Sequence, residues 1–163
     1  MNFLSLFKRK LIYQFKKKIP IDKDHFPNYT LDELFHHYGS DKANIFKGKN
    51  SKGHGFSNFY SLNLKALKDK QINILEIGSF AGSSAAAFSK YFSNSKIFCF
   101  DINISNFKYE SKKIFVYGLN INNRQKTDKT LKNIFKNYDF DKFDLIIDDG
   151  SHLLSDITKS LNY

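Results

Sequence analysis

The spacing of apolar residues predicts a helix at the start of the chain. Apolar side chains stand at positions 3, 4, 7, 11, 12, 15 and 19, mostly along one side of a helix, and Pro20 ends the pattern. Basic triplets at 8–10 and 16–18 interrupt every apolar run, which is not typical of an export signal. Two interpretations stay open: a basic helix on an anionic membrane surface, or a helix packed on its own domain or on a second subunit.

The segment that follows contains turn-forming and helical patterns. Both prolines fall within residues 20–30, which we predict to be a linker. Thr30 is a predicted N-cap, and Glu33 completes a capping box for a short helix that ends near Tyr38. Residues 39–58 are rich in Gly, Asn, Ser and Lys, so they are predicted to form a long loop.

From Gln71 onward, strand-like and helical patterns alternate. The predicted strands are 72–77, 96–102, 114–117 and 143–147; the predicted helices are 85–92 and 125–138, with another beginning in 151–161. The run 143–147 is apolar almost throughout, as in a parallel strand buried on both faces. The alternation predicts an α/β fold with an open, mainly parallel sheet.

Composition narrows the class of protein. The 163 residues, 41% of them hydrophobic, are enough for one domain with a packed core, and no apolar run is long enough to span a bilayer. Cys99 is the only cysteine, which excludes an internal disulfide and a cysteine-cluster metal site and favours a reducing, cytoplasmic environment.

Charge is distributed unevenly along the chain. The net charge is +10, and six basic residues and no acidic residue stand among the first 20 positions. All but two of the 26 basic residues are lysines, whereas proteins that read nucleic acid usually rely on arginine. We therefore expect no nucleic-acid partner. The basic segment 1–19 keeps peripheral membrane contact open.

Polar residues and glycines follow the predicted strands, where ligands bind in open α/β sheets. Gly78 and Gly82 would permit a tight turn and close backbone approach after the first strand. Their spacing is G-x-x-x-G, which differs from the dinucleotide-binding G-x-G-x-x-G, and no P-loop motif is present. A plain strand-to-helix turn explains this motif equally well.

The next two strands end in residues suited to an adenosine. The Asp101 carboxylate can accept hydrogen bonds from both hydroxyls of a ribose, although it could also cap the next segment. The side-chain amide of Asn120, after the third strand, could meet the edge of an adenine.

The fourth strand ends in Asp148-Asp149-Gly150-Ser151-His152. Asp149 could ligate a hard cation such as Mg²⁺, and His152 could take a proton from a hydroxyl near neutral pH. The alternative is that Asp149 or Ser151 caps the helix that follows.

Together these motifs resemble the class I S-adenosylmethionine-dependent methyltransferases, and within them the metal-dependent sugar O-methyltransferases of macrolide and surface-polysaccharide pathways. The resemblance covers about residues 34–160, in the motif order of that family. It rests on Tyr38-Gly-Ser-Asp-Lys42, Gly53-His-Gly55 with Tyr60, Leu75-Glu-Ile-Gly78, Gly82-Ser83, Phe100-Asp-Ile102 and Phe143-Asp-Leu-Ile-Ile-Asp-Asp-Gly-Ser-His152.

The resemblance implies a role for each candidate residue. The methionine and ribose side of the cofactor would be lined by Glu76, Gly78, Gly82 and Ser83. Asp101 would hold the ribose, and Asn120 would flank the adenine. Ser40, Asp41 and Lys42 would close the pocket, Asp149 would bind Mg²⁺, and His152 would be the general base.

The resemblance also implies an organisation and a function. Residues 1–30 would be a basic arm and linker, 31–70 a segment covering the cofactor, and 71–163 a partial Rossmann-like domain that lacks the family's last strands. The expected reaction is methyl transfer to a sugar hydroxyl in surface-polysaccharide or glycoside biosynthesis, in the cytoplasm or at the inner face of the membrane. The acceptor would be a sugar or glycan.

Because the motifs stop after the fourth strand, we expect a truncated enzyme, or half of a split one that a second chain or a homo-oligomer completes. Three alternatives stay open. The chain could bind S-adenosylmethionine without catalysis, act as a nucleotide-sugar or NAD-dependent enzyme, or attach to membranes through residues 1–19.

Overall fold

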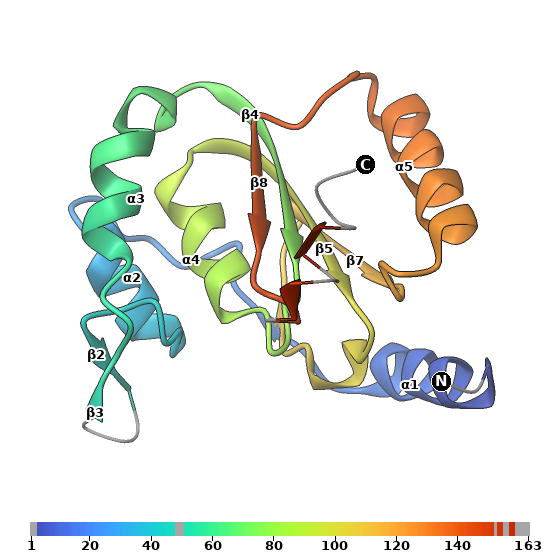
Figure 1. Ribbon diagram of the computed structural model, residues 1–163. Coiled ribbons are helices and arrows are strands. Elements are labelled where there is room, and N and C mark those ends of the chain that lie inside the picture. Colours follow the sequence, from blue (N-terminus) through green and yellow to red (C-terminus); the bar gives the residue numbers. More distant parts are fainter. Residues whose placement is uncertain (1–2, 48–50, 152, 155–156, 159–163) are drawn as a thin grey trace.

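The computed structural model describes residues 3–47, 51–151, 153–154 and 157–158. Its centre is a sheet of four parallel strands in the order β7-β5-β4-β8 (Figure 1). These strands are β4 (Gln71–Ile77), β5 (Asn94–Asp101), β7 (Ile114–Gly118) and β8 (Leu145–Asp148). The predicted α/β fold with a mainly parallel sheet is confirmed, and the carboxyl ends of all four strands meet at one edge.

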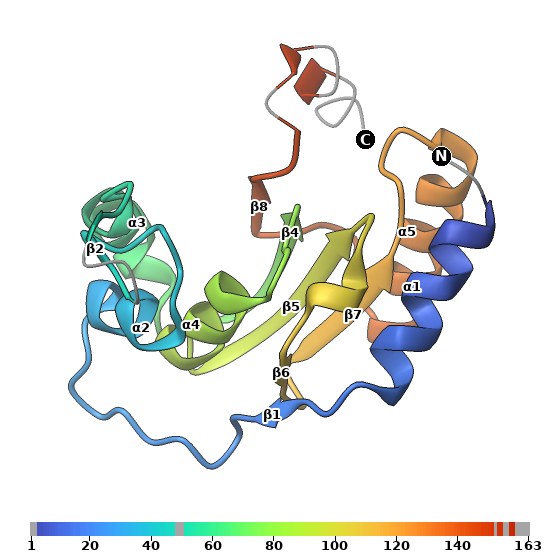
Figure 2. The ribbon, with the colours of Figure 1, turned by 90° about the horizontal axis from the view of Figure 1, so that it is seen from below.

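Helices cover both faces of the sheet (Figure 2). On one face lie α2 (Leu31–Tyr38), α3 (Ser57–Leu64) and α4 (Ser83–Tyr91), where Phe35 and Phe88 form an edge-to-face pair in the core. On the other face lies α5 (Arg124–Tyr138), whose Ile134 packs in a second cluster with Phe98 and Phe100. Two 3₁₀ turns, η1 (Lys65–Leu67) and η2 (Ile104–Asn106), complete the connections.

Local sequence signals match the structure well. The Thr30 side chain accepts a hydrogen bond from the Glu33 N–H, and the Glu33 carboxylate accepts one from the Thr30 N–H, so the predicted capping box is confirmed. The region predicted as a long loop, 39–58, holds the short hairpin of β2 (Ile45–Phe46) and β3 (Ser51–Lys52) and the start of α3.

The prediction that 143–147 is a strand buried on both faces is wrong on one point. β8 runs beside β4, but the Ile146 side chain is 59% exposed. Ile146 points to the α5 face of the sheet, and α5 covers the neighbouring strands rather than β8 (Figure 1). Of the helix predicted in 151–161, the structure describes Leu154, Ile157 and Thr158 as helical.

The first helix, α1 (Phe3–Phe15), packs on the chain's own domain beside η2. Arg9 donates a hydrogen bond to the Ile102 carbonyl at 3.0 Å, and Tyr13 meets Phe107 edge to face. The helix ends earlier than predicted because the chain then forms β1 (Ile19–Pro20), which pairs in parallel with β6 (Tyr109–Glu110). In the described part of the chain, no helix has the length and hydropathy needed to cross a bilayer.

Candidate functional site

Two cavities lie at the carboxyl edge of the sheet. A cavity of about 610 Å³ lies between the segment after α2 and the turn after β4, and one of about 430 Å³ lies between the ends of β4, β5 and β7. Gly78, Phe80 and Asp149 line both. Cavities of this size suit a small ligand, and their position is where ligands bind in open α/β sheets.

The turn after β4 requires Gly78. Its φ is +84°, and a Cβ there would collide with the backbone of Asp149 and Gly150. The absence of a side chain therefore lets the β4 turn approach the end of β8. Gly82 also has a positive φ, but it lies against the Phe107 ring and lines neither cavity.

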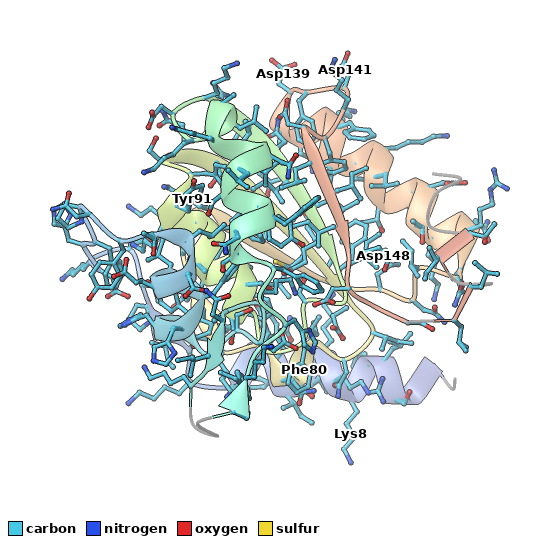
Figure 3. The ribbon with its side chains drawn as sticks, turned by 60° about the vertical axis from the view of Figure 1, so that its left-hand side comes forward. Lys8, Phe80, Tyr91, Asp139, Asp141 and Asp148 are labelled. Atoms are coloured by element: carbon cyan, nitrogen blue, oxygen red, sulfur yellow. The ribbon has the colours of Figure 1, made fainter. Side chains whose placement is uncertain are left out.

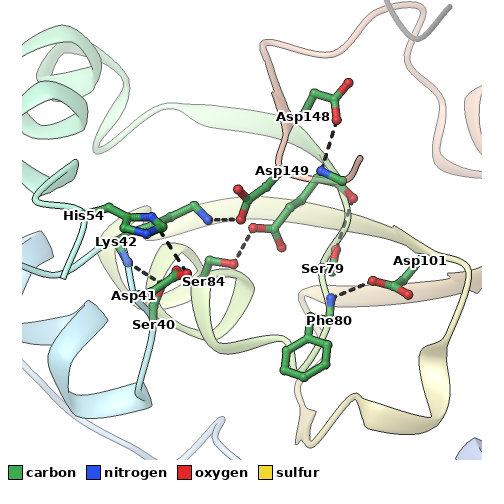
Figure 4. A network of polar contacts seen from close by, with 12 residues as sticks. Ser40, Asp41, Lys42, His54, Ser79, Phe80, Ser84, Asp101, Asp148 and Asp149 are labelled. Carbon is green, nitrogen blue, oxygen red and sulfur yellow. Dashed lines mark hydrogen bonds and ion pairs between the residues drawn. The ribbon is translucent and has the colours of Figure 1, made fainter. Parts of the chain in front are cut away.

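Between the cavities stands Phe80, a residue that the sequence analysis did not single out. Its φ is +42°, which is uncommon for a residue with a side chain, and 65% of its surface is exposed. Its backbone N–H donates a hydrogen bond to an Asp101 carboxylate oxygen at 2.7 Å (Figure 4). This bond holds the turn against the end of β5. No local sequence signal predicts the strained conformation.

Asp101 and Asn120 line the smaller cavity together. The second carboxylate oxygen of Asp101 accepts the Asn103 N–H at 2.5 Å, so the residue does cap its own loop. Each carboxylate oxygen has a further lone pair beyond these two bonds, so capping and ligand binding are compatible. The Asn120 side-chain oxygen accepts the Asn122 N–H at 3.0 Å, which orients the amide.

Buried charges lie beside the larger cavity. The Lys42 ammonium forms an ion pair with the Asp149 carboxylate, and its side chain is only 4% exposed (Figure 4). Glu76 is fully buried. One of its carboxylate oxygens accepts the Ser84 hydroxyl, and the other has no hydrogen-bond partner among the residues that the structure describes.

Burial and charge shift the pKa values of this cluster. Burial raises the pKa of the Glu76 carboxyl, even though Lys42 and the Ser84 hydroxyl favour its charged form. Burial lowers the pKa of Lys42, but the attraction of Glu76 and the contact with Asp149 outweigh it, so the pKa of Lys42 is raised. Lys42 therefore carries its charge at neutral pH.

The segment Ser40–Lys42 lines the larger cavity and begins where α2 ends. The Ser40 hydroxyl oxygen accepts a hydrogen bond from the Lys42 backbone N–H. The Asp41 Oδ2 atom lies 3.9 Å from the Nδ1 atom of His54. His54 is a lining residue that the sequence analysis placed in the resemblance but not in the site. Other lining residues absent from the predicted site include His37, Phe46, Lys47, Ser79, Ser84, Lys108 and Tyr109.

Eight of the predicted site residues line one or both cavities. Ser40, Asp41, Lys42 and Ser83 line the larger cavity, Asp101 and Asn120 the smaller one, and Gly78 and Asp149 both. Glu76 and Gly82 line neither cavity, although the Glu76 carboxylate accepts the hydroxyl of Ser84, which lines the larger one. His152 lies outside the described residues.

The described residues do not by themselves fit a metal ion. Within them, no group of three histidine, cysteine or acidic side chains is placed to hold one. The carboxylate of Asp149, the predicted metal ligand, is paired with Lys42. Six or more oxygen ligands are typical of hard cations, so this carboxylate alone is not a Mg²⁺ site.

Comparison with known proteins gives a structural match. No protein-family model matches the chain, and no curated protein matches it in sequence. Two solved structures of the MycE methyltransferase from the mycinamycin biosynthetic pathway are similar to it, each with 22% sequence identity and a TM-score of 0.65. One holds Mg, S-adenosylhomocysteine (SAH) and mycinamycin VI, and the other holds Mg and SAH. The chain shares the fold of the matched part of these structures.

The match extends over 83% and 82% of this chain and over 35% of the MycE chain in each structure, so the chain spans about a third of the length of these neighbours. This likeness confirms the predicted fold class, a Rossmann-like α/β fold with a mainly parallel sheet. It is also consistent with cavities at the carboxyl ends of β4, β5, β7 and β8.

Proposed function

We propose that the chain binds S-adenosylmethionine and serves methyl transfer to a sugar hydroxyl in surface-polysaccharide or glycoside biosynthesis, in the cytoplasm. The observation that carries this proposal is that two cavities share Gly78, Phe80 and Asp149 at the carboxyl edge of the sheet. A long ligand with two chemically different ends fits such a pair of cavities. The likeness to SAH-bound methyltransferases supports the same ligand class.

The smaller cavity would hold the adenosine. Asp101 has lone pairs left for the two ribose hydroxyls, and Asn120 offers an oriented amide to the base. The larger cavity would hold the amino-acid end beside Ser83 and the segment Ser40–Lys42. Ser83 begins α4, and a helix N-terminus favours a carboxylate.

When bound, S-adenosylmethionine supplies a methyl group on a sulfonium, which is already a strong electrophile. The protein's main task is then to orient the acceptor oxygen and exclude water. The segment Ser40–Lys42 would do both at the larger cavity, which it lines. The Lys42–Asp149 ion pair fixes this segment to the end of β8. His152 as general base and Asp149 as Mg²⁺ ligand stay predictions from the resemblance.

Isothermal titration tests the proposal. SAH should bind the full chain with micromolar affinity, whereas NAD⁺, the cofactor of the competing enzyme class, should not bind. Asp101→Ala should weaken SAH binding about tenfold or more, because hydrogen bonds to a charged group are worth about 1.5–3 kcal/mol each. Asp128→Ala, which removes a 46% exposed carboxylate on α5, is the matched control. NAD⁺ binding, or SAH binding that Asp101→Ala does not change, would contradict the proposal.

A non-catalytic cofactor-binding role is the second candidate. It is favoured by the Lys42–Asp149 ion pair, which neutralises Asp149 without a metal. The spectrum of Mn²⁺ bound to the chain separates the two. A bound-ion signal that Asp149→Asn removes supports the metal-dependent enzyme, and SAH binding without any such signal supports the binding role.

A further inference from the structure

The first helix packs on the domain through Arg9 and Tyr13, and through Lys16 just beyond its end. Arg9 donates to the Ile102 carbonyl at 3.0 Å, and the Lys16 ammonium donates to the carbonyls of Ser105 and Asn106 at 2.9 and 3.2 Å. Tyr13 contributes the aromatic contact, with its ring centroid 6.4 Å from that of Phe107. Helices of globular domains usually bury their apolar stripe, whereas much of the stripe of α1 is exposed.

The apolar stripe faces away from the domain. Phe7, Leu11 and Phe15 follow one another at intervals of four residues, which places them along one line of the helix. Their exposed fractions are 54%, 38% and 86%, and Ile12 beside them is 45% exposed. Ile19, just beyond the helix, is 52% exposed. A contiguous exposed apolar stripe of this kind is typical of an interaction site.

Positive charge surrounds the stripe. Lys8, Lys10 and Lys17 are exposed, and the Lys8 side chain points away from the body of the molecule (Figure 3). Residues 1–21 contain no acidic side chain, so no carboxylate of this segment offsets the lysines. The helix therefore offers apolar contact and positive charge on the same side.

We propose that α1 is a docking surface for an anionic lipid bilayer. Its apolar stripe would enter the boundary between headgroups and acyl chains, while the surrounding lysines contact the anionic headgroups. The contacts of Arg9 and Lys16 would keep the domain attached to the docked helix. A lipid surface fits better than a second copy of this chain, because a copy would bring the same positive charge against itself.

The position of α1 relates this surface to the cavities. Ile102, whose carbonyl accepts the Arg9 guanidinium, lines the smaller cavity, and α1 lies at the end of the molecule where the strands end (Figure 1). Docking through α1 would hold this edge of the sheet near the bilayer. The inference does not depend on which ligand occupies the cavities.

Flotation with lipid vesicles tests the proposal on the full chain. The chain should float with phosphatidylcholine vesicles that contain about 30% phosphatidylglycerol and remain unbound with phosphatidylcholine alone. Replacing Lys8, Lys10 and Lys17 together with glutamine should lower the partition coefficient about a hundredfold, because each lysine near an anionic surface contributes about a factor of five. Phe7→Ser with Phe15→Ser should lower it at least about tenfold.

Phe59→Ser with Leu62→Ser is the matched control, since these α3 residues are 64% and 81% exposed and lie away from the basic segment. This variant should float like the parent chain. Equal flotation with neutral vesicles, or no flotation, would overturn the proposal. A homodimer would also overturn it, if light scattering detects one that does not bind vesicles and that dissociates in the variant Phe7→Ser with Phe15→Ser. The stripe would then bind a second copy of the chain. Circular dichroism confirms that each variant is folded.

Discussion

The Lys42 ammonium and the Asp149 carboxylate, 107 positions apart in the sequence, form an ion pair that joins the segment after α2 to the end of β8. The Lys42 side chain is nearly inaccessible, and the buried carboxyl of Glu76 lies close enough to affect its pKa. One lysine therefore compensates two acidic groups at the edge of the sheet.

Replacing Lys42 with methionine should destabilise the fold by about 3 kcal/mol, because it leaves the buried Glu76 and the partly exposed Asp149 without their cation. Urea unfolding followed by circular dichroism measures the change. Lys47→Met is the control, since this exposed side chain donates to the His37 carbonyl in α2, and it should cost less than about 0.5 kcal/mol. Equal stability of Lys42→Met and the parent chain would show that the pair contributes nothing.

Glu76 should make stability fall as the pH rises. The pKa of Glu76 is raised in the folded chain, so between the ordinary value of 4.5 and the raised pKa the unfolded chain is deprotonated while the folded chain still holds the proton. Deprotonation therefore stabilises the unfolded state relative to the folded state as the pH rises. Relative to Glu76→Gln, the parent chain should lose up to about 1.4 kcal/mol for each pH unit between 4.5 and the raised pKa. Unfolding at pH 4 to 8 measures this slope.

Glu33→Gln gives the opposite slope and serves as the control. The Thr30 N–H and hydroxyl lower the pKa of the exposed Glu33 carboxyl. Its contribution to stability is therefore present above its ordinary pKa and is lost as the pH falls through the lowered one. Slopes of the same sign for Glu76→Gln and Glu33→Gln would contradict the assignment of Glu76.

Gly78→Ala should affect both the fold and ligand binding. The added Cβ would strain a backbone with φ of +84° and collide with the backbone of Asp149 and Gly150, at a cost of about 3 kcal/mol or more. Gly39→Ala separates the two effects, because Gly39 has a similar φ of +74° but no atom within 4 Å of an added Cβ. It should cost about 1 kcal/mol and lower SAH affinity less than Gly78→Ala does. Similar losses for the two variants would argue against a close approach at Gly78.

Phe107→Ala should cost about 3–5 kcal/mol, because the ring is fully buried between Gly82 and Tyr13. Limited proteolysis should then cut the variant near α1 faster than the parent chain. Phe59→Ala, which removes a 64% exposed ring, should change neither measurement. A stable Phe107→Ala variant with an unchanged α1 cleavage rate would show that the ring does not hold the helix.

Sequence patterns predicted what depends on neighbouring residues. The capping box of Thr30 and Glu33 needs four consecutive positions, and the strand ending at Ile77 is an apolar run followed by a glycine. The side of α1 that packs on the domain could not be predicted, because it depends on carbonyls of Ile102, Ser105 and Asn106 that come much later in the chain. The ion pair of Lys42 also needed the fold, since nothing local links it to Asp149.

The pairing of Ile19 with Tyr109 also has a consequence for the order of events during synthesis. Contacts between residues this far apart in the sequence form slowly, because the entropy cost of closing the long loop between them comes before the contact stabilises the fold. α1 leaves the ribosome before η2, Phe107 and β6 have been made, so every partner that holds it is synthesised later. In the nascent chain this helix is therefore made before the surface that it packs on, and its attachment to the domain is among the later steps of folding.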